Sequence, residues 1–275
     1  MFAESPFKQG KSCMNIDLKG RNAMVCGSTD GIGKAAAIEL ASMGASVILV
    51  ARNEEKLLAT KKLLDTSKGQ EHHFLVADFN LPHELKVRVE DYVAELGPVH
   101  ILVNNTGGPA SGPIIEAKPE EFIHTFNAHL ICNHILVQAL MDGMKESGYG
   151  RIINVISTSV KQPLPNLGVS NTIRAAVGNW SKTLAGELGK FGITVNNVLP
   201  GATNTQRLQG LAQKKAEKTG TSADAVLKEM ASEVPMQRVA EPHEIAAAIA
   251  FLASPAASYI NGINVPVDGG RTGCL

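Results

Sequence analysis

Three glycines stand close together directly after a short apolar segment near the start of the chain. They form the pattern Gly27-x3-Gly31-x-Gly33, and an alanine-rich amphipathic segment follows. Glycines at such a turn let the backbone approach a pyrophosphate, and the next helix offers free N–H donors and the positive end of its dipole. The context predicts either a dinucleotide-binding turn or a tight turn without a ligand, and we favour the first. The turn consists of Gly27, Ser28, Thr29, Asp30, Gly31, Ile32 and Gly33.

The residues after the second apolar segment bear on the choice between NAD and NADP. Proteins that bind NAD usually carry an acidic residue there, which bonds the ribose 2′-hydroxyl, whereas an arginine accommodates the 2′-phosphate of NADP. This chain has Ala51-Arg52-Asn53. Because no carboxylate repels a phosphate and Arg52 can form a bidentate pair with one, we expect NADP(H) to be preferred over NAD(H). The alternative is that Arg52 is only a solvated residue after a strand.

The rest of the chain alternates between apolar segments of strand length and amphipathic segments of helix length. Strands are expected over 23–26, 47–50, 73–76, 101–103, 152–156, 194–198 and 263–267. Helices are expected over 32–43, 53–65, 82–96, 119–144 and 171–190. The strands are short and continuously apolar, which is typical of a parallel sheet covered on both faces. The pattern predicts an α/β fold, a doubly wound (Rossmann) seven-stranded parallel sheet with helices on both faces.

Further landmarks follow in an order that resembles the short-chain dehydrogenase/reductase family, over about residues 16–270. They are the glycine turn, Asp78, Asn104-Asn105-Thr106-Gly107, Asn127, Pro200-Gly201 with Thr205, and Val267-Asp268-Gly269-Gly270. The resemblance implies that Asp78 meets the adenine ring of the cofactor and that the turn at Pro200-Gly201 packs on the nicotinamide. The implied cofactor contacts outside the glycine turn and Arg52 are Asp78, Asn104, Arg174, Pro200, Gly201, Thr203 and Thr205.

The resemblance also implies a catalytic site, and there the chain departs from the family. The family uses a serine, an asparagine, and a tyrosine and lysine one helical turn apart. Ser157 and Asn127 match the serine and the asparagine, whereas Ser170 and Arg174 stand where the tyrosine and the lysine are expected. No tyrosine is an obvious substitute among Tyr92, Tyr149 and Tyr259. The implied catalytic residues are therefore Asn127, Ser157, Ser170 and Arg174.

This departure leaves three hypotheses open. A serine is a far weaker acid than a phenol, whose ordinary pKa is about 10, and an arginine does not release a proton at working pH. The chain is either an active NADP(H)-dependent carbonyl reductase or alcohol dehydrogenase with an atypical site, 3-oxoacyl thioesters being one candidate substrate class, or a catalytically impaired NADP(H)-binding sensor or partner subunit. A third hypothesis is another reaction, such as enoyl reduction. His129 is expected to be structural, because residues two apart on a helix do not share a face.

Composition limits the partners. Lys+Arg and Asp+Glu number 26 each, which argues against nucleic acid or an anionic membrane as the main partner. No apolar run approaches the roughly 18 residues of a membrane span. The four cysteines show no metal-binding spacing, so we expect no metal, reduced thiols and a cytoplasmic protein. A small-molecule carbonyl or alcohol is the expected substrate, and the resemblance implies a homo-oligomer, either a tetramer or a dimer.

A single domain is expected over 16–275, preceded by a flexible arm or tag over 1–15. One segment, about 206–234, breaks the alternation of strands and helices because it is polar and carries Gly-Thr-Ser-Ala-Asp at 220–224. Ser222 or Asp224 is expected to start a helix there. The segment is either a solvated pair of helices or a mobile lid over a substrate cleft.

Overall fold

Seven parallel strands form one sheet in the order β3-β2-β1-β4-β5-β6-β7. The computed structural model describes residues 14–274, so the arm expected over 1–15 lies outside the described residues except for Met14 and Asn15. The strands are β1 (Asn22–Cys26), β2 (Ser46–Ala51), β3 (His73–Val76), β4 (Ile101–Asn104), β5 (Gly150–Val155), β6 (Ile193–Pro200) and β7 (Asn264–Val267). All seven coincide with predicted strands to within a few residues, and the predicted fold class is confirmed.

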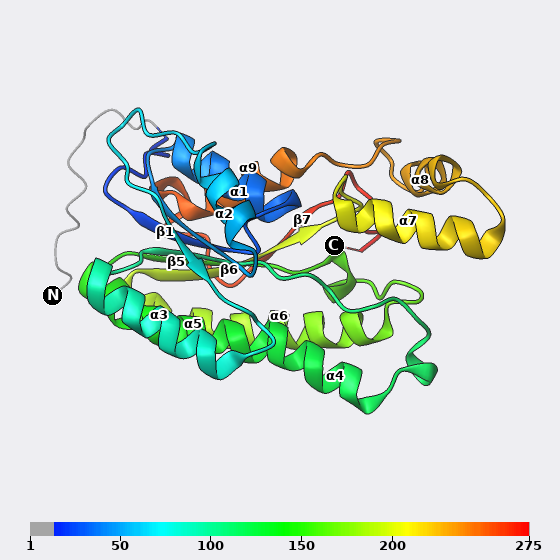
Figure 1. The fold of residues 1–275 in the computed structure, drawn as a ribbon, viewed down its shortest axis with the longest axis horizontal. Helices are drawn as coiled ribbons and strands as arrows, with labels where there is room; N and C mark the ends of the chain where they lie inside the picture. Colours follow the sequence, from blue (N-terminus) through cyan, green and yellow to red (C-terminus); the bar gives the residue numbers. More distant parts are fainter. Residues whose placement is uncertain (1–13, 275) are drawn as a thin grey trace, which may run out of the picture.

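Helices cover both faces of the sheet (Figure 1). One face carries α1 (Gly31–Ser42), α2 (Glu54–Lys61) and α9 (Pro242–Ala253). The other carries α3 (Pro82–Leu96), α4 (Pro119–Phe126), α5 (Cys132–Glu146) and α6 (Gly168–Leu188). Strand residues alternate between the two cores, so that Val25 packs in one and Met24 in the other. Within residues 14–274, none of the helices combines the length and the apolar character that crossing a membrane requires.

The strand order reverses at β1, which pairs with β2 on one side and β4 on the other. In doubly wound sheets, ligands bind in the crevice outside the carboxyl ends of the strands at such a point. A ladder of asparagine side chains lies at one level across β4 to β7. Asn104 donates to Asn154 at 2.8 Å, Asn154 to Asn197 at 3.0 Å, and Asn197 to Asn264 at 2.8 Å. These hydrogen bonds pair side chains from neighbouring strands and favour this strand register below the crevice.

The long helix predicted over 119–144 is interrupted by a π-helical turn at Asn127–Ile131. Within it, the N–H of Cys132 bonds the carbonyl oxygen of Asn127. The wider turn changes the angle between neighbouring side chains, so the spacing rule for an α-helix does not hold there. It leaves His129 buried and Asn127 half-buried. Such turns occur often at functional sites.

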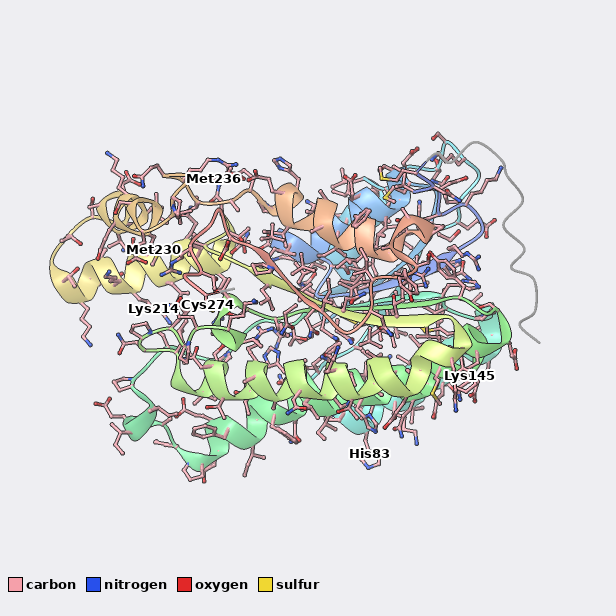
Figure 2. The ribbon with its side chains drawn as sticks, turned by 180° about the vertical axis from the view of Figure 1, so that it is seen from behind. His83, Lys145, Lys214, Met230, Met236 and Cys274 are labelled. Carbon is pink, nitrogen blue, oxygen red and sulfur yellow. The ribbon has the colours of Figure 1, made fainter. Side chains whose placement is uncertain are left out.

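The segment at 206–234 forms two helices, α7 (Gln206–Thr219) and α8 (Ala223–Ser232). Ser222, one of the two predicted start residues, caps α8 by accepting the N–H of Ala225 at 3.2 Å. The helices pack on each other through a small core of Ala212, Ala216 and Val226. Figures 1 and 2 show the pair extending past one end of the sheet, with Lys214 on α7 and Met230 on α8. The predicted helix pair is present, and its action as a lid is a proposal.

Candidate active site

The glycine turn joins β1 to α1, where the backbone passes close to the loop after β4. Gly27 and Gly31 have φ angles of +59° and +51°, in the left-handed region that favours glycine. A Cβ atom on Gly33 would lie 2.2 Å from the carbonyl oxygen of Gly27, and one on Gly27 would lie 2.7 Å from that of Asn105. No side chain caps α1, since Asp30 forms no capping hydrogen bond. The N–H groups at this helix start are therefore free to bind an anion.

A cavity of about 470 Å³ lies beside the turn, at the carboxyl ends of β1 to β4. Arg52 and Asp78, both predicted cofactor contacts, line it together with Thr29 of the turn. Lys56, in the first turn of α2, adds a second cation next to Arg52. Sequence reasoning missed Lys56, although its spacing from Arg52 in a predicted helix was a usable signal. Two cations and no carboxylate at the end of β2 fit the 2′-phosphate of NADP.

A second cavity, of about 210 Å³, lies over β5 and β6. It brings together predicted residues from three parts of the chain: Ile32, Arg174, Pro200, Gly201, Thr203 and Thr205. Thr205 also caps α7, because its hydroxyl accepts the N–H of Leu208 at 3.3 Å. A Cβ atom on Gly31 would lie 2.9 Å from the Thr205 side chain. The glycine turn and the start of α7 therefore meet at the edge of this cavity.

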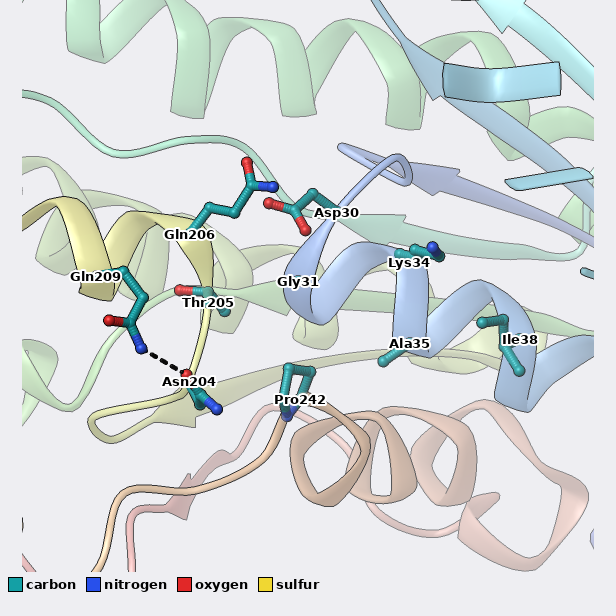
Figure 3. Close-up of a pocket in the computed structure, with 10 residues that line it drawn as sticks. All are labelled: Asp30, Gly31, Lys34, Ala35, Ile38, Asn204, Thr205, Gln206, Gln209 and Pro242. Atoms are coloured by element: carbon teal, nitrogen blue, oxygen red, sulfur yellow. Dashed lines mark hydrogen bonds between the residues drawn. The ribbon is translucent and has the colours of Figure 1, made fainter. Parts of the chain in front are cut away.

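A third opening, of about 570 Å³, lies between the start of α1, the start of α7 and Pro242 (Figure 3). Gln209 donates to Asn204 at 2.9 Å along its wall. Asp30 and Lys34 are its charged residues, and both are solvent-accessible. Thr205 lines this opening and the second cavity, and so forms part of the wall between them. No catalytic group predicted from the sequence lines this opening.

Arg174 is a buried cation without an acidic partner. Its side chain is 9 % exposed, and Nη1 donates to the carbonyl oxygen of Val155 at 2.8 Å. No carboxylate within residues 14–274 forms a salt bridge with it. Burial and the positive charge of Arg207 lower the pKa of Arg174 to about 10, so the guanidinium stays charged at neutral pH. Burying an unpaired charge is costly, and such groups are enriched at functional sites.

The other predicted catalytic residues, Ser170, Ser157 and Asn127, do not line the cavity that contains Arg174. Ser170 is half-buried and one turn before Arg174 on α6, so the two share a helix face. Ser157 follows β5, and its hydroxyl accepts the N–H of Ser159 at 3.1 Å. Asn127 lies in the π-helical turn, which packs against α6. Within residues 14–274, no group of three or more His, Cys, Asp and Glu side chains is placed to hold a metal ion.

None of the three tyrosines lines the cavity beside the glycine turn or the second cavity, over β5 and β6. Tyr149 donates to the carbonyl oxygen of Ala253 at 2.6 Å, and Arg21 and Arg151 stack on its ring at the amino end of β5. Tyr92 is buried in α3, and Tyr259 is fully exposed. The described structure therefore offers no phenol beside Arg174.

Asn104 and His129 are both buried, but only His129 lines a cavity. Asn104 is 2 % exposed and its side chain lies in the asparagine ladder. Asn105, by contrast, lines the cavity beside the glycine turn and the second cavity. His129 is 4 % exposed and lines the cavity of about 470 Å³, and its Nε2 has no hydrogen-bond partner within residues 14–274. Burial, followed by the charge of Arg174, lowers the pKa of His129 to about 2. The neutral ring can form a hydrogen bond but is not a proton source near neutral pH.

Comparisons with known proteins agree with this geometry. The chain matches, over residues 27–272, the family described as Enoyl-(Acyl carrier protein) reductase. The 3-oxoacyl-[acyl-carrier-protein] reductase FabG of Vibrio cholerae is 35% identical over 258 residues, which cover 93% of this chain and 98% of that protein. The NADPH-dependent reductase BacG of Bacillus subtilis is 31% identical over 251 residues, with 91% and 97% covered.

Solved structures show the same relationship. The structure of L-sorbose reductase from Gluconobacter frateurii complexed with NADPH and L-sorbose has a TM-score of 0.90 and 33% sequence identity. The match covers 95% of this chain and 100% of that chain. The glycine turn, the strand order and the cavities at the carboxyl ends of the strands are thus set in a sheet shared with these enzymes. The chain belongs to the short-chain dehydrogenase/reductase family.

Proposed function

We propose that this protein reduces a carbonyl group of a small molecule with NADPH. The observation that carries the proposal is the second cavity, where charged, buried Arg174 faces the turn from Pro200 to Thr205 beside the glycine turn. The names of similar proteins, a 3-oxoacyl reductase and a sorbose reductase crystallised with NADPH, support the same reaction class. The matched family's description also names enoyl reduction, which remains the alternative reaction to test.

The residues at the strand ends divide the binding of NADPH between them. The free N–H groups of the glycine turn and of α1 receive the pyrophosphate, while Arg52 and Lys56 pair with the 2′-phosphate. Asp78, which lines the same cavity, would meet the adenine ring. When bound, NADPH supplies the hydride that adds to the carbonyl carbon. The chain itself has to orient the carbonyl and stabilise the charge that develops on its oxygen.

Arg174 supplies the main electrostatic stabilisation in this proposal. It is held charged beside the reacting group, and a fixed positive charge in a dry site stabilises a developing oxyanion more than it does in water. Ser157 and Ser170 offer hydroxyl donors, and the proton reaches the oxygen from Ser170 or an ordered water. Without a phenol as the general acid, the rate of reduction is lower by a factor of about 10²–10⁴. We therefore propose a substrate whose carbonyl is intrinsically reactive.

Arg52→Ala is expected to weaken NADPH binding by about tenfold to a hundredfold and to leave NADH binding unchanged. A charge-assisted hydrogen bond contributes about 1.5–3 kcal/mol, and NADH lacks the phosphate that Arg52 would pair with. Fluorescence titration of both nucleotides measures the effect. Lys62→Ala, which removes an exposed cation at the other end of α2, is the matched control. If Arg52→Ala weakens both nucleotides equally, the assigned role of Arg52 is wrong.

Rapid-mixing assays test the reaction itself. NADPH oxidation is followed against aldehydes, ketones, 3-oxoacyl thioesters and 2-enoyl thioesters. We expect turnover with at least one carbonyl class and none with the enoyl thioesters. Turnover with enoyl thioesters alone would assign the alternative reaction. Tight NADPH binding without turnover on any compound would instead support a sensor or partner subunit.

A further inference from the structure

Two arginines meet at the loop after β4. Arg207, in the first turn of α7, donates to the carbonyl oxygens of Gly108 at 2.7 Å and Pro109 at 2.8 Å. A Cβ atom on Gly108 would lie 2.8 Å from Nη2 of Arg207 and 3.5 Å from Nη2 of Arg174. Both guanidinium groups are therefore close to one side of Gly108. Within residues 14–274 neither forms a salt bridge.

The two guanidinium groups have N–H donors to spare. Each carries five N–H groups, and the carbonyl contacts of each occupy two. Both side chains line the second cavity, whose other walls include the apolar Ile156, Leu208 and Leu211. Like charges held together in a partly dry site repel each other, and an anion between them would relieve that repulsion. Carboxylate and phosphate are the groups that guanidinium forks bind best.

The surroundings add a third unsatisfied group. His129 is buried, and its Nε2 has no hydrogen-bond partner within residues 14–274; burial first, and then the charges of Arg174 and Arg207, lower its pKa. Arg207 is solvent-exposed, so the cost of an unpaired buried charge falls on Arg174, which is 9 % exposed. The cost is offset when an anion binds.

We propose that Arg174 and Arg207 together bind a carboxylate of the substrate, carried close to the carbonyl group that is reduced. This inference rests on the proposed function. The phosphates of NADPH share the chemistry of an oxyanion, but the glycine turn, Arg52 and Lys56 already provide for them at the other cavity. Because Arg207 belongs to α7, a carboxylate held by both arginines also fastens the helix pair over the cavity.

The first test measures binding without turnover. Oxalate is titrated calorimetrically into the enzyme with and without saturating NADPH. We expect oxalate to bind the NADPH complex, and Arg207→Gln to weaken that binding by about tenfold or more. Lys214→Gln, which removes an exposed cation from the same helix, is expected to change nothing. Displacement of oxalate by NADPH would assign the arginines to the phosphates of the cofactor and overturn the proposal, as would equal losses in the two variants.

The second test uses pyruvate and methyl pyruvate, in which a neutral methyl ester replaces the carboxylate. The ratio of kcat/KM for the acid to that for the ester is expected to fall about tenfold in Arg207→Gln and to stay constant in Lys214→Gln. An unchanged ratio in Arg207→Gln would contradict the proposal. NADPH affinity is measured in each variant as the check on folding. Oxalate binding needs no reduction, so its loss in Arg207→Gln supports this site even where the proposed reaction fails.

Discussion

Ser170→Tyr combined with Arg174→Lys is expected to raise kcat/KM for carbonyl reduction by about 10²–10⁴. The two positions lie one turn apart on one face of α6, and Ser170 is half-buried. A phenol there would be a general acid with an ordinary pKa of about 10, which the neighbouring ammonium would lower toward working pH. In the wild type, Arg174 supplies the positive charge, but Ser170 is too weak an acid to replace the phenol. NADPH oxidation in rapid-mixing assays measures the gain.

Two comparisons separate this explanation from general disturbance of α6. Thr172→Tyr with Arg174→Lys puts the phenol on the exposed side of the same helix and should give no gain. Ser170→Tyr alone adds the acid but keeps the guanidinium, and should recover part of the effect. If the double variant binds NADPH normally and is no faster than the wild type, proton donation does not limit the rate. Ser157, Ser170 or water would then already suffice.

The sheet was predictable because its strands are short, apolar and separated by helix-length segments. Helix α9 was not predicted from the sequence. Its stretch from Ile245 to Ala253 is apolar all round, and so lacks the polar face that marks a surface helix. Its start carried a readable signal, since Pro242 stands at the first position and Glu241 and Glu244 form a capping box. The π-helical turn at Asn127–Ile131 left no comparable mark in the residue pattern.

The site was predictable where it depends on local backbone, and not where it depends on distant contacts. The glycine turn follows from its own residue spacing. By contrast, Arg207 contacts Gly108 and Pro109 across about a hundred residues of chain. Asn104 and Asn105 differ because neighbouring residues at a strand end point to opposite faces, which settles which of the two meets the cavity. No spacing rule reports that Arg174 lacks a counter-ion, since that depends on every residue packed around it.

Arg174→Met is expected to make the protein more stable and nearly inactive. An unpaired buried cation costs several kcal/mol, whereas losing its hydrogen bond to the Val155 carbonyl costs about 1–3 kcal/mol. We expect a net gain of about 1–2 kcal/mol and a rise in Tm of a few degrees. The same change removes the charge that stabilises the developing oxyanion, so kcat/KM should fall about 10²–10³-fold. Thermal unfolding and steady-state kinetics measure the two effects.

The pH dependence of stability tests independently whether the buried charge of Arg174 destabilises the folded protein. Because burial holds the pKa of Arg174 in the folded state at about 10, below its ordinary value of 12.5, the stability cost is present below pH 10. As pH rises through about 10, the folded protein loses this proton before the unfolded chain does, so the wild type regains stability relative to Arg174→Met. Over the same interval the activity of the wild type should fall.

Arg174→Lys keeps a charge and should show no gain in Tm at neutral pH. A variant Arg174→Met that melts earlier than the wild type at pH 7 would show that the guanidinium stabilises the fold and would contradict the expected gain in stability.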